Sequence, residues 1–155
     1  MTRVALDTNI LAYLAGVSRD ARDDAKIDQI RNLIARLSSG VSLIAPAQTL
    51  GELFVVLRRG GASAEEARAV LIEFAQAFGS SVSEPKTIVA AADLVVDHKL
   101  QFWDALILTA AADAGCTLLL SKDMQDGFVT RGPTVVNPLR DSLNTKHATL
   151  LEASH

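Results

Sequence analysis

The stretch from Phe102 to Gly127 constrains the fold of this chain more than any other. Residues 105–112 would be apolar on nearly every side of a helix, and a helix with that pattern is buried in a domain interior. After a turn at Gly115, the run from Thr117 to Leu120 is apolar and has no internal turn signal, which is typical of a central strand covered on both faces. This stretch therefore predicts an α/β domain.

Two carboxylates flank these buried elements. Asp104 stands at the start of the helix, at the edge of the core, and Asp123 follows just beyond the carboxyl end of the strand. In open α/β sheets, ligands and catalytic groups collect outside the carboxyl ends of the strands. The sequence therefore predicts a functional site near Asp123, to which acidic residues in equivalent places elsewhere could contribute.

Asp7 occupies such a place. A short apolar strand, residues 4–6, ends on Asp7, and an apolar helix follows from Ile10. The simplest interpretation is that Asp7, Thr8 or Asn9 caps this helix, because short polar side chains accept hydrogen bonds from its free N–H groups. The alternative is that Asp7 belongs to the functional site.

Glu52 is the fourth candidate. It lies among apolar residues of a helix that follows a second predicted strand, residues 41–45, so its carboxylate should be partly desolvated. A desolvated charge needs a partner. A salt bridge with Arg58 or Arg59 and a bound metal ion are the two alternatives, and the sequence alone does not separate them.

The other expected elements complete one domain. Residues 20–37 have the apolar periodicity of a helix, and Ser63 with Glu66 forms a capping box for another helix. Val82 is expected in a short edge strand, and Pro85 is expected to open a helix. The apolar stripe of that helix comprises Ile88, Val89, Ala92, Val95 and Val96.

Composition excludes several classes of protein. The 155 residues are 49% hydrophobic and 21% charged, which indicates one packed globular domain. A net charge of −3 argues against a strongly basic nucleic-acid-binding protein. It does not exclude a nuclease, because several acids gathered in one site lower the charge while basic groups elsewhere meet phosphate.

Cys116 is the single cysteine, and it lies beside the apolar strand, so we expect a buried free thiol. A free thiol fits a reducing compartment. No amino-terminal signal pattern is visible, and Asp113 interrupts the apolar run after Asp104 too early for a membrane span. These features predict a soluble, cytoplasmic protein without membrane association.

Four carboxylates therefore stand at element boundaries or in apolar surroundings: Asp7, Glu52, Asp104 and Asp123. Each alone could be a cap or half of an ion pair. Brought together they would repel one another strongly unless cations neutralised them. Mg²⁺ or Mn²⁺ is the natural cation because these ions prefer oxygen ligands, whereas zinc would want cysteine or histidine ligands at suitable spacing.

Four segments containing these acids resemble the motifs of PIN-domain proteins: LDTNIL from Leu6, TLGELF around Glu52, FWDALIL around Asp104 and LLSKDMQDG around Asp123. Their order and spacing match across nearly the whole chain. The resemblance implies a three-layer α/β/α domain with a central, mainly parallel sheet and metal-dependent RNA cleavage. In bacteria it also implies frequent use as the toxin of a VapC-type toxin–antitoxin pair, with a cognate antitoxin as partner.

The resemblance also implies roles for individual residues. Mg²⁺, which Mn²⁺ could replace, would be held by Asp7, Glu52, Asp104 and Asp123, and water activated by the metal would hydrolyse the phosphodiester. Polar side chains beside these acids would support the ligands or orient the RNA substrate. The candidates for that supporting role are Thr8, Asn9, Ser121, Lys122 and Asp126.

Lys122 departs from the family pattern, because its position in the SKD segment is commonly acidic in similar sequences. Three interpretations of Lys122 stay open. It could contact a phosphate of the substrate, pair with a carboxylate of the site, or point to solvent.

The resemblance implies that residues 1–137 form the nuclease domain, followed by a tail, residues 138–155. Leucines are scattered along this tail without a periodic face, so it is either disordered or docked on a partner. The apolar helices from Ile10 and from Ser63 offer more hydrophobic faces than a small sheet needs. Together with the resemblance, this predicts a homodimer.

Other functions remain as alternatives. A receiver-type phosphoacceptor would want adjacent acids after the first strand, and a haloacid-dehalogenase-type phosphatase would want an aspartate where Asn9 stands. A non-catalytic PIN module that binds RNA or protein is the stronger rival. The complete set of four acids argues against it.

Overall fold

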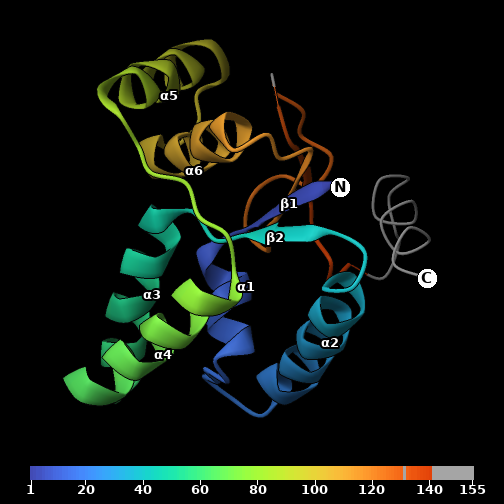
Figure 1. The fold of residues 1–155 in the computed structure, drawn as a ribbon, viewed down its shortest axis with the longest axis vertical. Coiled ribbons are helices and arrows are strands. Elements are labelled where there is room, and N and C mark those ends of the chain that lie inside the picture. Colours follow the sequence, from blue (N-terminus) through green and yellow to red (C-terminus); the bar gives the residue numbers. More distant parts are fainter. Residues whose placement is uncertain (131, 141–155) are drawn as a thin grey trace.

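The structure, a computed structural model, describes residues 1–130 and 132–140. Its centre is a four-stranded sheet with the order β2-β1-β3-β4, in which every neighbouring pair of strands is parallel (Figure 1). The strands are β1 (Arg3–Leu6), β2 (Ser42–Ile44), β3 (Leu118–Leu120) and β4 (Thr134–Val136). The predicted α/β fold with a mainly parallel sheet is confirmed.

Helices cover both faces of this sheet (Figure 1). Val4 and Leu6 of β1 pack against α1, α2, α3 and α4, while Ala5 between them packs against α5 and α6. Such alternation follows from the two-residue period of a strand. The predicted three layers are therefore present. The helices are α1 (Thr8–Leu14), α2 (Arg22–Leu37), α3 (Ala47–Arg59), α4 (Ala64–Ala77), α5 (Pro85–His98) and α6 (Phe102–Asp113).

The core is built from the elements whose apolar patterns are clearest in the sequence. Leu6 and Leu120 are 0% exposed, and full burial of such a side chain stabilises the fold by roughly 1.5–3 kcal/mol. Every residue from Ala105 to Ala111 in α6 is buried, as predicted. Cys116 is also buried, as expected, and this burial raises the pKa of its thiol to about 11.

The capping box at the start of α4 is confirmed, since Ser63 Oγ accepts a hydrogen bond from Glu66 N and the Glu66 side chain accepts one from Ser63 N. The edge strand predicted at Val82 is wrong, because Val82 is 69% exposed and lies outside any strand. Gly79 instead forms a parallel bridge with Ile44. A Cβ atom at position 79 would lie only 2.7 Å from Ile44 Cδ1, so this close approach suits a glycine.

The helix predicted from Pro85 is present as α5, with Pro85 in its first turn. Its apolar stripe, however, faces outward in part: Val89 is 62% exposed and Val96 is 79% exposed. The buried positions of α5 are Thr87 and Ala91. Small side chains on this face let α5 pack closely on α6, which leaves the larger valines at the surface.

Residues 138–140 lie against the domain. The Pro138 carbonyl accepts a hydrogen bond of 3.3 Å from Gln29 Nε2, Leu139 packs on the main core, and Arg140 forms an ion pair of 3.4 Å with Asp126. The rest of the predicted tail, residues 141–155, lies outside the described residues, so the predicted domain boundary stays a prediction. Among the helices that the structure describes, none has the length and apolarity needed to cross a bilayer.

Candidate active site

The carboxyl ends of two adjacent strands place the first residues of the candidate site. β1 and β3 are parallel neighbours, so Asp7 after β1 and Ser121 after β3 come to the same edge of the sheet. The carboxyl end of β1 lies between α3 and α6 (Figure 1). There a cavity of about 360 Å³, here called the acidic cavity, is lined in part by Asp7, Thr8, Asn9, Glu52, Arg59, Asp104 and Asp123.

Asp7 is the most buried of these acids, with 6% of the residue exposed. Its Oδ1 accepts a 2.7 Å hydrogen bond from Thr8 N at the start of α1, and its Oδ2 accepts one of 2.7 Å from Ser121 Oγ. Asp7 therefore does cap α1, but only one of its oxygens is used for this. Burial raises the pKa of Asp7 to about 6. The two hydrogen bonds lower this pKa, whereas the negative charges of Asp104 and Glu52 raise it further.

Ser121 is fully buried and holds the Asp7 carboxylate from the β3 side. Its Oγ also accepts a 3.2 Å hydrogen bond from Met124 N, which fixes the turn after β3. Ser121 thus orients Asp7 in the geometry expected of a supporting residue.

Glu52 enters the acidic cavity from α3 and is hydrogen-bonded on both sides. Thr8 Oγ1 donates a bond of 2.5 Å to Oε2, and Gln48 Nε2 donates one of 2.7 Å to Oε1. The predicted alternative of a salt bridge with Arg58 or Arg59 is not realised: within residues 1–130 and 132–140, Glu52 forms no ion pair.

Gln48 was not foreseen from the sequence, although it stands four residues before Glu52 on the same helix face, a spacing that brings side chains together. Its Nε2 also lies 3.4 Å from the Trp103 carbonyl oxygen. Gln48 therefore links α3 to the start of α6, next to Asp104.

Asp123 and Asp104 complete the set of acids. Asn9 Nδ2 donates a hydrogen bond to Asp123 Oδ2. Asp104 is half-buried, and in the part of the chain that the structure describes its carboxylate has no hydrogen-bond donor or ion-pair partner. Burial, then the charges of Glu52 and Asp123, raise the pKa of Asp104.

The acidic cavity fits a hard divalent cation in the chemistry of its donors, since its four acids offer only oxygen and two of them have raised pKa values. Within the described residues, however, no three acidic, histidine or cysteine side chains already stand at the spacing of metal ligands. Hydrogen bonds hold Glu52 to Thr8 and Asp123 to Asn9.

Three predicted site residues, Ser121, Lys122 and Asp126, do not line the acidic cavity. Lys122 stands over Tyr13, with Nζ 5.6 Å from the ring centroid, and lines a neighbouring cavity. A hydrogen bond with the Tyr13 side chain, then the charges of Tyr13, Asp123 and Asp23, raise the pKa of Lys122. The solvent-facing interpretation of Lys122 is therefore not supported.

Asp126 makes contacts that hold the backbone. Its Oδ1 accepts a 2.8 Å hydrogen bond from Asn137 N, and its Oδ2 lies 3.4 Å from Arg140 Nη1. These contacts join the loop after β3 to the segment after β4. Any part of Asp126 in substrate binding stays a prediction.

A comparison with family models decides the classification, because the PIN-domain model matches residues 4–125. This chain belongs to the PIN-domain family. The four segments that first indicated the resemblance lie within or overlap the matched residues. No curated protein sequence matches the chain significantly.

Solved structures share the PIN fold of this chain. VapC20 of Mycobacterium tuberculosis, described as a toxin that cleaves the sarcin–ricin loop, is 23% identical with a TM-score of 0.64 over 84% of this chain and 99% of that one. A toxin–antitoxin complex from Klebsiella pneumoniae matches at 20% identity and a TM-score of 0.61, over 87% and 97%. VapBC2 of Rickettsia felis, bound to a DNA fragment from its promoter, matches at 16% identity with a TM-score of 0.61, over 79% of this chain and 89% of that one. At these identities the likeness shows the fold alone.

Proposed function

We propose that this PIN domain is a metal-dependent endoribonuclease and the toxin of a type II toxin–antitoxin pair. The observation that carries the proposal is that four carboxylates from separate segments line one cavity at the carboxyl edge of the sheet. Buried acids with raised pKa values cluster at functional sites. A purely structural role would leave this concentration of negative charge without a stabilising partner.

Each residue of the acidic cavity has a distinct part in the proposal. Asp7, Glu52, Asp104 and Asp123 hold Mg²⁺ or Mn²⁺. When bound, the ion supplies Lewis-acid activation of water and neutralises charge on the phosphodiester. Ser121 and Thr8 orient Asp7 and Glu52 through the hydrogen bonds that they donate. Asn9 holds Asp123.

A non-catalytic PIN module that binds RNA or protein is the alternative. It would need neither an intact set of acids nor the polar side chains that orient them. Here Thr8, Asn9 and Ser121 each donate to one of the acids, and this arrangement favours catalysis.

The toxin role rests on the structural neighbours, which include a toxin–antitoxin complex from Klebsiella pneumoniae and VapBC2 from Rickettsia felis. We therefore propose a small cognate antitoxin as partner, encoded next to this chain, and cellular RNA as substrate. Induced expression of the protein in a bacterial host should arrest growth. Expression of the Glu52→Gln variant should not, because a metal-binding charge is lost while the amide oxygen can still accept one of the hydrogen bonds from Thr8 and Gln48.

Growth arrest that depends on Glu52 should be relieved when the small protein encoded beside the toxin is expressed with it. Arrest of equal strength by the wild type and by Glu52→Gln, at equal protein levels, would contradict the ribonuclease proposal. The matched control is Glu73→Gln, which removes a carboxylate from an exposed position of α4.

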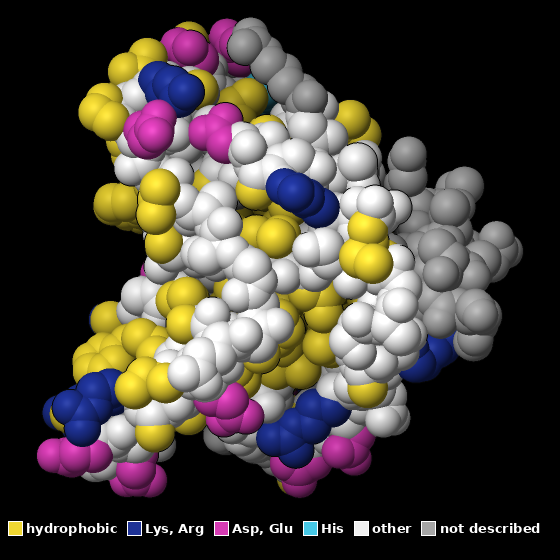
Figure 2. Space-filling view, viewed as in Figure 1, with side chains coloured by type: hydrophobic (Ala, Val, Ile, Leu, Met, Phe, Trp, Pro, Cys, Tyr) yellow, Lys and Arg dark blue, Asp and Glu magenta, His cyan; other side chains and the backbone are white. Residues whose placement is uncertain are grey.

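We also propose that the protein is a homodimer. The helix from Ile10 cannot supply the interface, because Ile10 and Leu11 are fully buried in the core. Exposed apolar side chains instead gather over α5 and over α3 and α4 (Figure 2). Of the nine large hydrophobic residues exposed in the described chain, five lie on α5 or beside it: Val82, Ile88, Val89, Val96 and Trp103.

Light scattering at micromolar concentration should give the mass of a dimer, and the double substitution Val89→Lys and Val96→Lys should shift it toward a monomer. These valines are seven residues apart and therefore lie on one face of α5, so two charges there would oppose burial of that face. Ile72→Lys on α4, where the isoleucine is 51% exposed, tests the other apolar surface in the same assay. A wild-type protein that scatters as a monomer would contradict the prediction.

A further inference from the structure

A second cavity, of about 320 Å³, opens beside the acidic cavity and is here called the side cavity. Asn9, Val56 and Asp123 line both cavities, so the two adjoin. Apolar atoms of Ala12 and Val17 also line the side cavity. A volume near 300 Å³ is at the lower end for ligand pockets, which suits one nucleotide better than a folded element.

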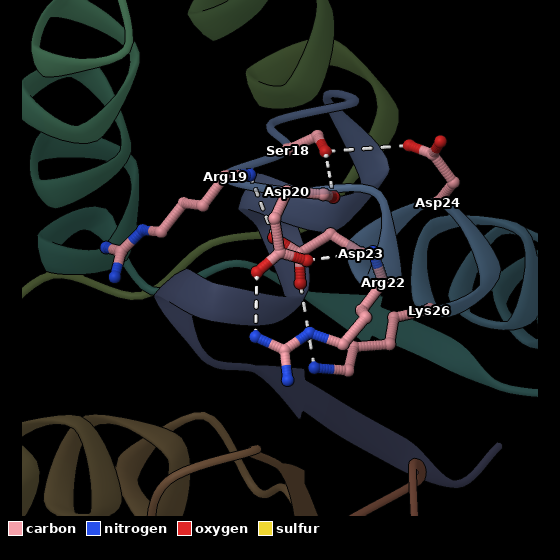
Figure 3. Close-up of polar contacts among 7 residues, drawn as sticks. All are labelled: Ser18, Arg19, Asp20, Arg22, Asp23, Asp24 and Lys26. Carbon is pink, nitrogen blue, oxygen red and sulfur yellow. Dashed lines mark hydrogen bonds and ion pairs between the residues drawn. The ribbon is translucent and has the colours of Figure 1, made fainter.

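Two acidic residues of the side cavity, Asp20 and Asp23, are already paired with cations at the start of α2 (Figure 3). Asp20 Oδ2 lies 3.2 Å from Arg22 Nη2, and Asp20 Oδ1 accepts a 2.8 Å hydrogen bond from Arg22 N. Asp23 accepts a 2.8 Å bond from Arg19 N and lies 3.6 Å from Lys26 Nζ. These contacts pair Asp20 and Asp23 with cations and engage Lys26, one of the three cations that line the cavity. The third carboxylate of the lining, Asp123, accepts a hydrogen bond from Asn9.

The other two cations are Arg19 and Lys122. Figure 3 shows the Arg19 side chain directed away from Asp20 and Asp23, toward α3, and Val56 of α3 lines the same cavity. Within residues 1–130 and 132–140, neither the Arg19 guanidinium nor the Lys122 ammonium forms an ion pair. The Arg19 guanidinium is therefore available to an anion that enters the cavity. Lys122 contacts Tyr13 and lies near Asp123, so it presents its charge to the same cavity from the other side of an existing contact.

We infer that the side cavity binds the nucleotide that adjoins the scissile phosphodiester, with its phosphate between Arg19 and Lys122 and its sugar or base against Ala12 and Val17. This inference rests on the proposed ribonuclease function and names the part of the substrate that the site holds. An RNA strand carries one phosphate per nucleotide, so a strand whose scissile phosphate lies in the acidic cavity presents the next phosphate nearby. Arginine and aromatic side chains are common ligands of unstacked RNA.

An acidic peptide segment of a partner protein is the competing occupant. The position beside the acidic cavity disfavours such a peptide, because a peptide that filled both cavities would bring its carboxylates against Asp123 and Asp7. RNA is also negatively charged, but RNA is the proposed substrate of the acidic cavity, and metal ions bound with it would offset the repulsion between its phosphates and these acids. The two occupants make different predictions for RNA binding.

The test measures binding of fluorescein-labelled single-stranded RNA by fluorescence anisotropy, with Mg²⁺ present and at two salt concentrations. The Asp7→Asn background prevents cleavage. Arg19→Ala and Lys122→Ala should each weaken binding by about 3- to 10-fold and lower the slope of log K against log salt by about 0.7, as expected when one phosphate contact to a single strand is lost. Thermal melting would verify that each variant is folded.

Arg68→Ala is the matched control. Arg68 carries the same charge at an exposed position of α4 and lines neither the side cavity nor the acidic cavity. Its removal should change RNA affinity less than twofold. Equal effects of Arg19→Ala, Lys122→Ala and Arg68→Ala would indicate general electrostatic attraction and would overturn the side cavity as a nucleotide site.

Two other results separate the inference from the function on which it rests. If the wild type cleaves RNA while Arg19→Ala and Lys122→Ala leave affinity unchanged, the inference fails and the ribonuclease function stands. If neither the wild type nor Asp7→Asn binds RNA, both fail. A rise in KM without a fall in kcat for the two variants, in the cleaving background, would support binding of the adjacent nucleotide.

Discussion

Replacement of Asp7 by asparagine should reduce RNA cleavage by at least about a hundredfold. The substitution preserves the size of the side chain and can keep the hydrogen bond from Thr8 N to Oδ1. It removes the charge of a proposed metal ligand, and removal of one preorganised electrostatic contact commonly costs catalysis by two to three orders of magnitude. The measurement is the initial rate of cleavage of a labelled RNA by purified protein with Mg²⁺.

The same substitution should stabilise the metal-free fold at neutral pH. The pKa of Asp7 is about 6 in the folded protein against an ordinary value of 3.8. The folded state therefore binds this proton more tightly than the unfolded state does. The resulting stabilisation is complete below about pH 4 and is lost as pH rises through about 6, with a total of about 3 kcal/mol.

Because asparagine does not ionise, Asp7→Asn should raise the free energy of unfolding at pH 7.5 by up to about 3 kcal/mol. The difference from the wild type should shrink toward zero at pH 4. Urea titrations of both proteins at both pH values, in the presence of chelator, measure this difference in the free energy of unfolding. A variant that cleaves RNA at the wild-type rate, or one less stable than the wild type at both pH values, would contradict the role given to Asp7.

Removal of divalent metal should abolish cleavage, and Mg²⁺ or Mn²⁺ should restore it. Mutual repulsion among Asp7, Glu52, Asp104 and Asp123 should also make the metal-free protein less stable than the loaded one. A ligand at a hundred times its Kd stabilises a protein by about 2.7 kcal/mol. Addition of Mn²⁺ should therefore raise the Tm by several degrees.

Asp104→Asn tests whether this shift arises in the acidic cavity. Asp104 is the acid without a hydrogen-bond donor among the described residues, so the substitution disturbs few native contacts while it removes one ligand charge. Asp104→Asn should reduce both the rise in Tm on addition of Mn²⁺ and the rate of RNA cleavage. Asp97→Asn, at an exposed position of α5, should reduce neither, and cleavage that persists at the full rate in excess chelator would refute metal dependence.

The sequence by itself determined the elements of this protein that depend on local pattern. Helix α6 is apolar throughout and β3 is a short apolar run, so their burial could be predicted before any contact was known. The capping box of Ser63 and Glu66 is equally local. Asp7 and Asp123, which follow two strands, could also be expected near one edge, because parallel strands bring their carboxyl ends to the same side of a sheet.

Tertiary structure alone decided how each acid is held. Asn9 donates to Asp123 across a separation of 114 residues, and Thr8 donates to Glu52 across 44. No periodicity in the sequence encodes such pairs, because the distance between two segments depends on how whole helices pack against the sheet. For the same reason the sequence left open whether Glu52 would pair with an arginine or belong to a metal site.

The side cavity also appears only in three dimensions. Lys122 is adjacent to Asp123 in sequence but lies over Tyr13 of α1 and lines a different cavity from most of the acids. Arg19 lines the same cavity, where Asp20 and Asp23 have other cationic partners, Arg22 and Lys26 of α2. A charged side chain can be recognised from sequence, but whether its charge is free or neutralised depends on contacts that form only when the chain folds.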